Sequence, residues 1–284
     1  MQRLWFLLVL LLGFGPSLAI PAEEPWAPGV KKIKDRGKLV VAQLKGVRPG
    51  FFGYDDHNRS PESASVTMDG KRLTGFDIEL AKGIAGVLGV ELVLDRTPAT
   101  FIDVCRYVAL GRADVGISKI TMTPYRAQFV RFTQPYARLR TGLIINRLRE
   151  SKSGRRVNLR TMTGLAGAEI GCIQGTSFEE LGKKIFHQSK MKDFPDETTM
   201  MDALKAGQML AVYFDEFEIK RRLKENPELN LHLRFEALPG KDDHKCLVVA
   251  PNNPDLLEFL NIFLIQRGIL YDADTILASY YTTP

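Results

Sequence analysis

The chain has 284 residues, of which 45% are hydrophobic and 25% charged, and this balance excludes a disordered or fibrous protein. The formal net charge is +6, but 39 Lys and Arg residues are dispersed among 33 acidic residues without a long basic block, so nucleic acid is not an expected partner. Three cysteines, Cys105, Cys172 and Cys246, lie far apart without metal-site spacing. We therefore expect no metal, no cofactor and at most one disulfide bond.

The N-terminus has the pattern of a secretory signal. Arg3 precedes an apolar run at 4–14, and small residues follow. A membrane-spanning helix is the alternative, but glycines and a proline interrupt the run before it reaches the roughly 20 apolar residues that a span needs. We predict a cleaved signal peptide over 1–22, with cleavage after Ala19 or Ala22, and export of the mature chain.

The first part of the mature chain alternates strand and helix patterns. A short buried strand is expected at 37–42, and a loop rich in Gly, Pro, Asp and Ser follows at 46–70. Segments 66–68 and 71–73 can pair as a hairpin across Asp69-Gly70. The next predicted elements are a helix at 75–89, a strand at 91–94, a helix at 101–110 and a strand at 113–117. This order is typical of a parallel sheet covered by helices.

The same order begins a second time further along the chain. The predicted elements are a β-rich stretch at 141–146, a basic segment at 147–160, a strand at 169–173, helices at 176–186 and 199–206, a strand at 210–214, a strand at 246–250 and a helix at 256–269. If the last strand returns to the first unit, two segments cross between the units and form a hinge. A single large sheet is the alternative that periodicity leaves open.

Five short motifs stand in a particular order. They are Gly75-Phe76-Asp77-Ile78-Glu79-Leu80-Ala81, the segment from Ile117 to Arg126, the segment from Phe132 to Tyr136, the segment from Ile173 to Ser177, and Phe214-Asp215-Glu216. In order and spacing they resemble the bacterial extracellular solute-binding proteins of family 3, the amino-acid-binding proteins of ABC importers. The resemblance runs from about Gly37 to the C-terminus. It implies an α/β protein with the type 2 periplasmic binding-protein fold, in which a two-crossing hinge joins two lobes.

This fold implies a division of the chain into lobes. Lobe 1 is expected at 23–141, lobe 2 at 142–240, and the returning part of lobe 1 at 241–284. The hinge is expected near 141–143 and 238–245.

Arg126 is the first candidate ligand-binding residue. Thr123-Pro124 is typical of a helix N-cap followed by Pro at the first helical position, which would hold Arg126 on a short fixed turn. A planar guanidinium suits a carboxylate, although a solvated surface arginine is the alternative. By resemblance Arg126 binds the ligand, and Ser118 and Thr121 beside it can offer donors to the same oxygens.

The second lobe supplies further candidates. Thr176-Ser177 and Glu179 have the capping-box pattern, which places a helix N-terminus with free backbone N–H groups after a glycine turn. Ordinary capping is the commoner role of this pattern, and it is compatible with a role in ligand binding. Asp215 follows an apolar strand and, by resemblance, pairs with the ammonium group of a ligand, although a helix cap is the commoner role of such a residue.

The remaining candidates concern specificity. By resemblance Phe76 lies against the apolar part of the ligand, whereas periodicity favours core packing. Lys45, Arg48 and Lys119 add cations around the expected cleft, and they argue against a Lys-like or Arg-like ligand unless they point to solvent. An acidic or neutral ligand is therefore preferred.

The resemblance implies a monomeric periplasmic protein that captures an amino acid or a related small carboxylate by lobe closure and delivers it to an ABC permease in the inner membrane. We expect no catalytic residues. One alternative is a dehydratase-like periplasmic enzyme of the same fold, for which Glu216 is the candidate acid. The other is a binding accessory of a periplasmic dehydrogenase system.

Overall fold

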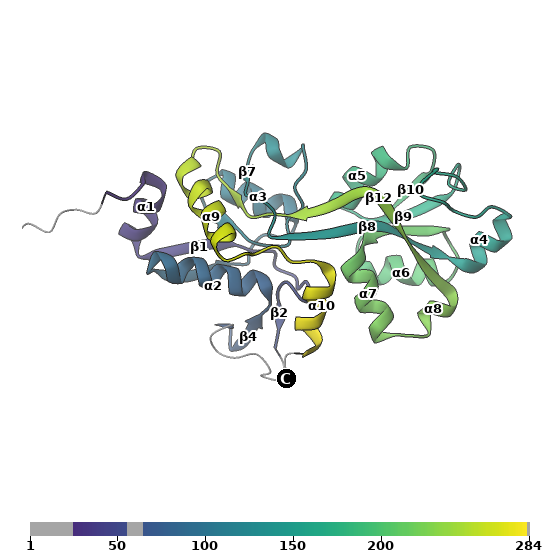
Figure 1. Cartoon of the computed structure of the whole chain (residues 1–284), viewed down its shortest axis with the longest axis horizontal. Helices are drawn as coiled ribbons and strands as arrows, with labels where there is room; N and C mark the ends of the chain where they lie inside the picture. The colour runs from purple at the N-terminus through teal and green to yellow at the C-terminus, as the bar shows by residue number, and fades with distance from the viewer. Residues whose placement is uncertain (1–24, 56–64, 283–284) are drawn as a thin grey trace, which may run out of the picture.

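The computed structural model describes residues 25–55 and 65–282, so the predicted signal peptide lies outside the described residues. Within these ranges the chain forms two α/β lobes, each with its own five-stranded sheet and its own hydrophobic core (Figure 1). The alternative of a single large sheet is therefore wrong. None of the helices in the described ranges is long and apolar enough to cross a membrane.

The sheet of lobe 1 has the strand order β5-β1-β6-β13-β7. Its strands are β1 (Lys38–Ala42), β5 (Glu91–Asp95), β6 (Val115–Gly116), β7 (Arg131–Phe132) and β13 (Val248–Val249). β1 runs parallel to β5 and β6, whereas β13 runs antiparallel to β6 and β7. The returning strand β13 thus completes a sheet that the N-terminal part of the chain begins.

The helices of lobe 1 are α1 (Pro28–Arg36), α2 (Phe76–Leu88), α3 (Phe101–Ala109), α9 (Pro254–Gln266) and α10 (Ala273–Thr282). α2 forms because apolar residues recur at helical spacing and bury one face, and it ends at Gly89, whose φ of 68° is left-handed. A small sheet of β2 (Gly53–Tyr54), β4 (Lys71–Thr74) and β3 (Val66–Met68) contains the predicted hairpin, which is confirmed.

The sheet of lobe 2 has the order β10-β9-β11-β8-β12. Its strands are β8 (Ala137–Asn146), β9 (Glu169–Ile173), β10 (Lys190–Phe194), β11 (Ala211–Asp215) and β12 (Leu233–Lys245), and its helices are α4 (Arg147–Ser153), α5 (Ser177–Ile185), α6 (Glu197–Lys205), α7 (Glu216–Glu225) and α8 (Leu229–His232). β9 lies parallel to β11, as the second strand-helix pattern predicts, and also to β10, a strand that the sequence pattern did not predict. All three cysteines are buried and free, so they form no disulfide bond with one another.

The two lobes are joined by β8 and β12, which run side by side between them in Figure 1. These strands pair antiparallel, but the register shifts between Ala237 and Asp242. Across this irregularity the Thr141 hydroxyl donates a 2.9 Å hydrogen bond to the carbonyl of Lys241. The crossings that were expected near 141–143 and 238–245 therefore lie in one paired two-stranded element.

Candidate functional site

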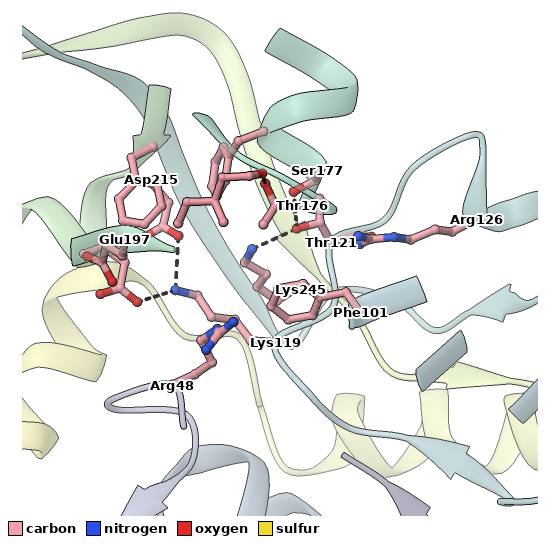
Figure 2. Close-up of a pocket in the computed structure, with 14 residues that line it drawn as sticks. Arg48, Phe101, Lys119, Thr121, Arg126, Thr176, Ser177, Glu197, Asp215 and Lys245 are labelled. Atoms are coloured by element: carbon pink, nitrogen blue, oxygen red, sulfur yellow. Dashed lines mark hydrogen bonds and ion pairs between the residues drawn. The ribbon is translucent and has the colours of Figure 1, made fainter. Parts of the chain in front are cut away.

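A cavity lies between the lobes, where the loops that follow β6, β9 and β11 meet (Figure 2). Its empty volume, which includes space open to solvent, is about 480 Å³. The residues that line it are Arg48, Phe101, Lys119, Thr121, Arg126, Ile173, Thr176, Ser177, Phe178, Glu197, Phe214, Asp215, Glu218 and Lys245. Six predicted site residues are thus brought together: Lys119, Thr121, Arg126, Thr176, Ser177 and Asp215.

Arg126 begins a short 3₁₀ helix, Arg126–Gln128, on the lobe 1 side of the cavity. The expected N-cap at Thr123 is wrong, because the N-cap residue of this helix is Tyr125, but the Thr123 hydroxyl still holds the turn by accepting a 3.3 Å hydrogen bond from the backbone N–H of Arg126. The guanidinium donates to the carbonyl of Thr121 at 2.9 Å and lies 5.8 Å from the ring centre of Phe101. Arg126 is only 4% exposed, and burial lowers its pKa. Within the described chain no carboxylate forms an ion pair with it, so its charge is available to an anion.

The hydroxyl of Thr121 accepts hydrogen bonds that link the two lobes. Ser177 Oγ of lobe 2 donates to Thr121 Oγ1 at 3.0 Å, and Lys245 Nζ donates to the same oxygen at 2.9 Å. Lys245 also forms an ion pair of 2.5 Å with Asp243, and burial lowers the pKa of Lys245. The site therefore has a second buried cation, which sits at the end of a hinge strand.

Helix α5 begins at the cavity with Thr176 as its N-cap residue. The capping-box prediction is wrong, because the Thr176 hydroxyl turns back and donates to the carbonyl of Ile173 at 2.6 Å. The Glu179 carboxylate accepts instead from the backbone N–H of Gly175 at 2.7 Å. The first backbone N–H groups of a helix have no intrahelical partner, so the positive end of α5 still faces the cavity.

Lys119 reaches across the cavity toward lobe 2 (Figure 2). Its Nζ lies 3.1 Å from Asp215 Oδ2 and 2.9 Å from Glu218 Oε1. Burial alone would lower the pKa of Lys119, but these two carboxylates raise it above its ordinary value. For Glu218, Lys119 and Arg221 outweigh the effect of burial and lower the pKa to about 2. Asp215 also caps α7, because its Oδ1 accepts from the N–H of Glu218 at 3.0 Å.

Arg48 brings a further cation to the cavity. Its guanidinium lies 5.1 Å from the ring centre of Phe101, and burial lowers its pKa. Lys45 is exposed and does not line the cavity. Of the three cations that the sequence places around the cleft, Arg48 and Lys119 therefore face it.

The bacterial extracellular solute-binding proteins of family 3 match this chain over residues 56–268. The chain belongs to this family. It is similar to the L-cystine-binding protein TcyJ of Escherichia coli (strain K12), with 26% identity over 260 residues that cover 92% of this chain and 87% of that protein. It is also similar to a probable histidine-binding protein of Campylobacter jejuni, with 32% identity over 74% of this chain and 77% of that protein.

The fold is that of type 2 periplasmic amino-acid-binding proteins. The amino acid ABC transporter substrate-binding protein AbpA of Streptococcus pneumoniae, solved bound to L-arginine, superimposes with a TM-score of 0.63. Sequence identity to it is 28%, and the match covers 89% of this chain and 98% of that one.

Two predicted site residues of this family member lie elsewhere. Phe76 packs in the core of lobe 1 with its ring 4.1 Å from that of Tyr271, since the turn at Gly75 starts α2 and aims Phe76 into the lobe. Ser118 is fully buried behind the cavity lining, and its hydroxyl accepts a 2.9 Å hydrogen bond from the N–H of Leu44. Neither residue lines the cavity, so their contact with a ligand stays a prediction from the resemblance.

The sequence pattern also missed cavity residues, namely Phe101, Phe178, Glu197, Glu218 and Lys245. Glu218 follows Asp215 by three residues in the first turn of α7, which was the available signal for it. Glu216, the candidate acid of the enzyme alternative, is instead held by Arg140 and Lys220, and their hydrogen bonds lower its pKa.

Proposed function

We propose that this chain is a monomeric binding protein that captures an amino acid or a related small carboxylate, acidic or neutral, and presents it to an ABC permease in the inner membrane. The observation that carries the proposal is the Arg126 guanidinium, which is buried at the interlobe cavity without an ion-pair partner in the described residues. An unpaired buried charge is costly, so an anionic ligand would stabilise it.

The surroundings of Arg126 favour a carboxylate. Thr121 and Ser177 bring hydroxyl groups to the same cavity, and α5 directs its N-terminus there. The relatives described above are named for cystine, histidine and a bound arginine, all of which carry a carboxylate. Arg48 adds a further cation, which would repel a ligand with a cationic side chain.

Lobe closure follows from the position of the cavity. Residues of both lobes line it, and a ligand that touches both lobes favours the closed arrangement by its differential contacts. The paired strands β8 and β12 offer a hinge that can rotate with little repacking. The signal-like pattern at the N-terminus supports action in the periplasm.

The test is calorimetry on protein that has been unfolded, stripped of ligand and refolded, with a panel of amino acids and small carboxylates. A ligand at 100 times its Kd stabilises the native state by about 2.7 kcal/mol, so a thermal shift identifies it first. Arg126→Ala should then lower the affinity about 30-fold or more, because removing one partner of a buried charge pair costs roughly 2–5 kcal/mol. Arg131→Ala, an exposed arginine of the same segment, is the matched control.

An unchanged affinity in Arg126→Ala would remove this residue from the site. Chromatography of the same incubations separates a binder from an enzyme, since a binder returns its ligand unaltered. A converted product would overturn the proposal in favour of an enzyme of this fold.

A further inference from the structure

Lys119 fills the part of the cleft that faces the acidic residues of lobe 2. Besides its ion pairs with Asp215 and Glu218, its ammonium lies 4.9 Å from the ring centre of Phe51 and 5.2 Å from that of Phe217. The Lys119 side chain is 5% exposed, and those of Asp215 and Glu218 are 1% and 4% exposed. The chain itself thus provides a desolvated ammonium with two carboxylates and two aromatic rings around it.

The backbone holds Lys119 in this place. Its φ of 49° is left-handed, which is unusual for a residue with a side chain. The Asp77 carboxylate of α2 accepts a 2.8 Å hydrogen bond from the N–H of Lys119, and Asp77 also accepts a 2.7 Å bond from the hydroxyl of Tyr136. Because both anchors are buried, the position of Lys119 is determined by the core of lobe 1.

The carboxylates that line the cavity all have cationic partners within the chain. Asp215 pairs with Lys119. Glu218 also accepts two 3.0 Å hydrogen bonds from Arg221. Glu197 binds the guanidinium groups of Arg222 and, at 3.7 Å, of Arg221. A ligand ammonium would therefore have to displace a buried cation before it could reach any of these oxygens.

The cations of the cavity are not balanced in the same way. Lys245 has Asp243 as its partner, but Arg126 and Arg48 form no ion pair with any described residue. Both of these guanidinium groups lie over the same ring, that of Phe101, so they belong to one region of the cavity. Glu218 and Glu197 act on the charge of Arg48, and Asp243 and Glu180 on that of Arg126, only from beyond ion-pair distance, so each guanidinium can still take a ligand carboxylate as its direct partner.

We propose that the ligand is a small dicarboxylate without an ammonium group, held by Arg126 at one carboxylate and by Arg48 at the other. Lys119 is then a specificity-determining residue, because it occupies the place at Asp215 that the ammonium of an amino acid would take. This inference rests on the proposed function and narrows its ligand class. It replaces the expectation that Asp215 binds a ligand ammonium.

The experiment compares matched pairs of compounds on the refolded full-length mature protein by calorimetry. The pairs are succinate and L-aspartate, glutarate and L-glutamate, and adipate and L-2-aminoadipate, which differ only in the ammonium group. At least one dicarboxylate should bind, and about 30-fold more tightly than its amino counterpart. Equal or tighter binding of the amino acid overturns the inference but leaves the proposed function standing. Binding of no amino acid and no carboxylate overturns both.

Two variants test the roles proposed for Lys119 and Arg48. Lys119→Met frees the lobe 2 carboxylates and should reduce the preference for the dicarboxylate about tenfold or more, whereas Lys119→Arg should keep it. Arg48→Gln should weaken the dicarboxylate about tenfold and leave the matching monocarboxylate unchanged, with exposed Lys45→Gln as its control. An unaltered preference in folded Lys119→Met, or equal losses for both compounds in Arg48→Gln, would contradict the assignment. The wild-type comparison decides the question even if a variant fails to fold.

Discussion

Replacing Lys119 by Met should open the two lobes when no ligand is added. Lys119 belongs to lobe 1, whereas its ion-pair partners Asp215 and Glu218 belong to lobe 2. Methionine keeps an unbranched apolar stem but removes the ammonium. The substitution therefore deletes the charged contact between the lobes without leaving a large void in the packing.

The size of the effect follows from the burial of these groups. Removing one partner of a buried ion pair leaves an uncompensated buried charge and costs about 3–5 kcal/mol. In an open arrangement water would reach both carboxylates, so this cost falls on the closed arrangement alone. A change of about 3 kcal/mol corresponds to a shift of about 150-fold in the ratio of closed to open molecules.

The assay measures a distance between the lobes. Leu110 of lobe 1 is 70% exposed and Leu231 of lobe 2 is 75% exposed, so cysteines at these positions accept spin labels while the three buried native cysteines do not. Lys183→Met is the matched control, because Lys183 is exposed and binds Glu179 within lobe 2. The same distance distribution in wild type and in Lys119→Met would refute the argument, as would an unchanged scattering radius.

Two other predictions concern stability. Burial raises the pKa of Asp77 to about 7 from about 3.8, so between these pH values the folded state binds more protons than the unfolded state. The free energy of unfolding of wild type should therefore fall relative to that of Asp77→Asn by about 1.4 kcal/mol per pH unit as pH rises from 4 to 7. Urea titrations at several pH values measure this difference. A difference between the two proteins that does not change with pH would contradict the prediction. Gly142→Ala should destabilise by about 1–3 kcal/mol, because the new Cβ would lie 2.2 Å from the backbone oxygen of Glu236 in the hinge. Gly86→Ala is its control, because this position in α2 has open space around a new Cβ. Alanine favours a helix over glycine, so a small gain in stability against urea is expected. An equal loss of stability in both variants would contradict the steric explanation for Gly142.

The sequence predicts an element correctly where the residues that stabilise it are close to it in the chain. The period of α2, its closing Gly89 and the hairpin at 66–73 are of this kind, and the structure has all three. Arg126 is another case, because the Thr123 hydroxyl that accepts a hydrogen bond from its backbone N–H lies three residues away. Such features need no knowledge of the other lobe.

The long hinge strand β12 could not be predicted in this way. It contains Pro239-Gly240 and several charged residues, which are typical of a loop. It is a strand because β8 pairs with it on both sides of the register shift, and the irregular stretch contains the Pro-Gly pair. The pairing is between residues about a hundred positions apart, so no local pattern reports it.

Phe76 shows the limit of a motif. Its place at the start of α2 is compatible with either a core or a ligand-facing side chain, and the neighbouring Tyr271, which comes from the far end of the chain, determines that it packs in the core. For Lys119 the outcome is reversed, because a residue usually exposed to solvent is buried in the cleft. A lysine in a polar loop is usually solvated, and only the buried Asp77 that fixes its backbone turns it into the cleft.

Under the proposed ligand class, the specificity and the closure of this site would depend on the same residue, Lys119. A ligand shifts the balance between open and closed arrangements only by its differential contacts. An ammonium-bearing ligand can reach Asp215 only by displacing Lys119, and it thereby breaks the ion pair that joins the lobes. The dicarboxylate proposed above would leave that pair intact and add its own contacts to Arg126 and Arg48. This proposal predicts that the cleft discriminates against amino acids by charge, through the Lys119–Asp215 ion pair.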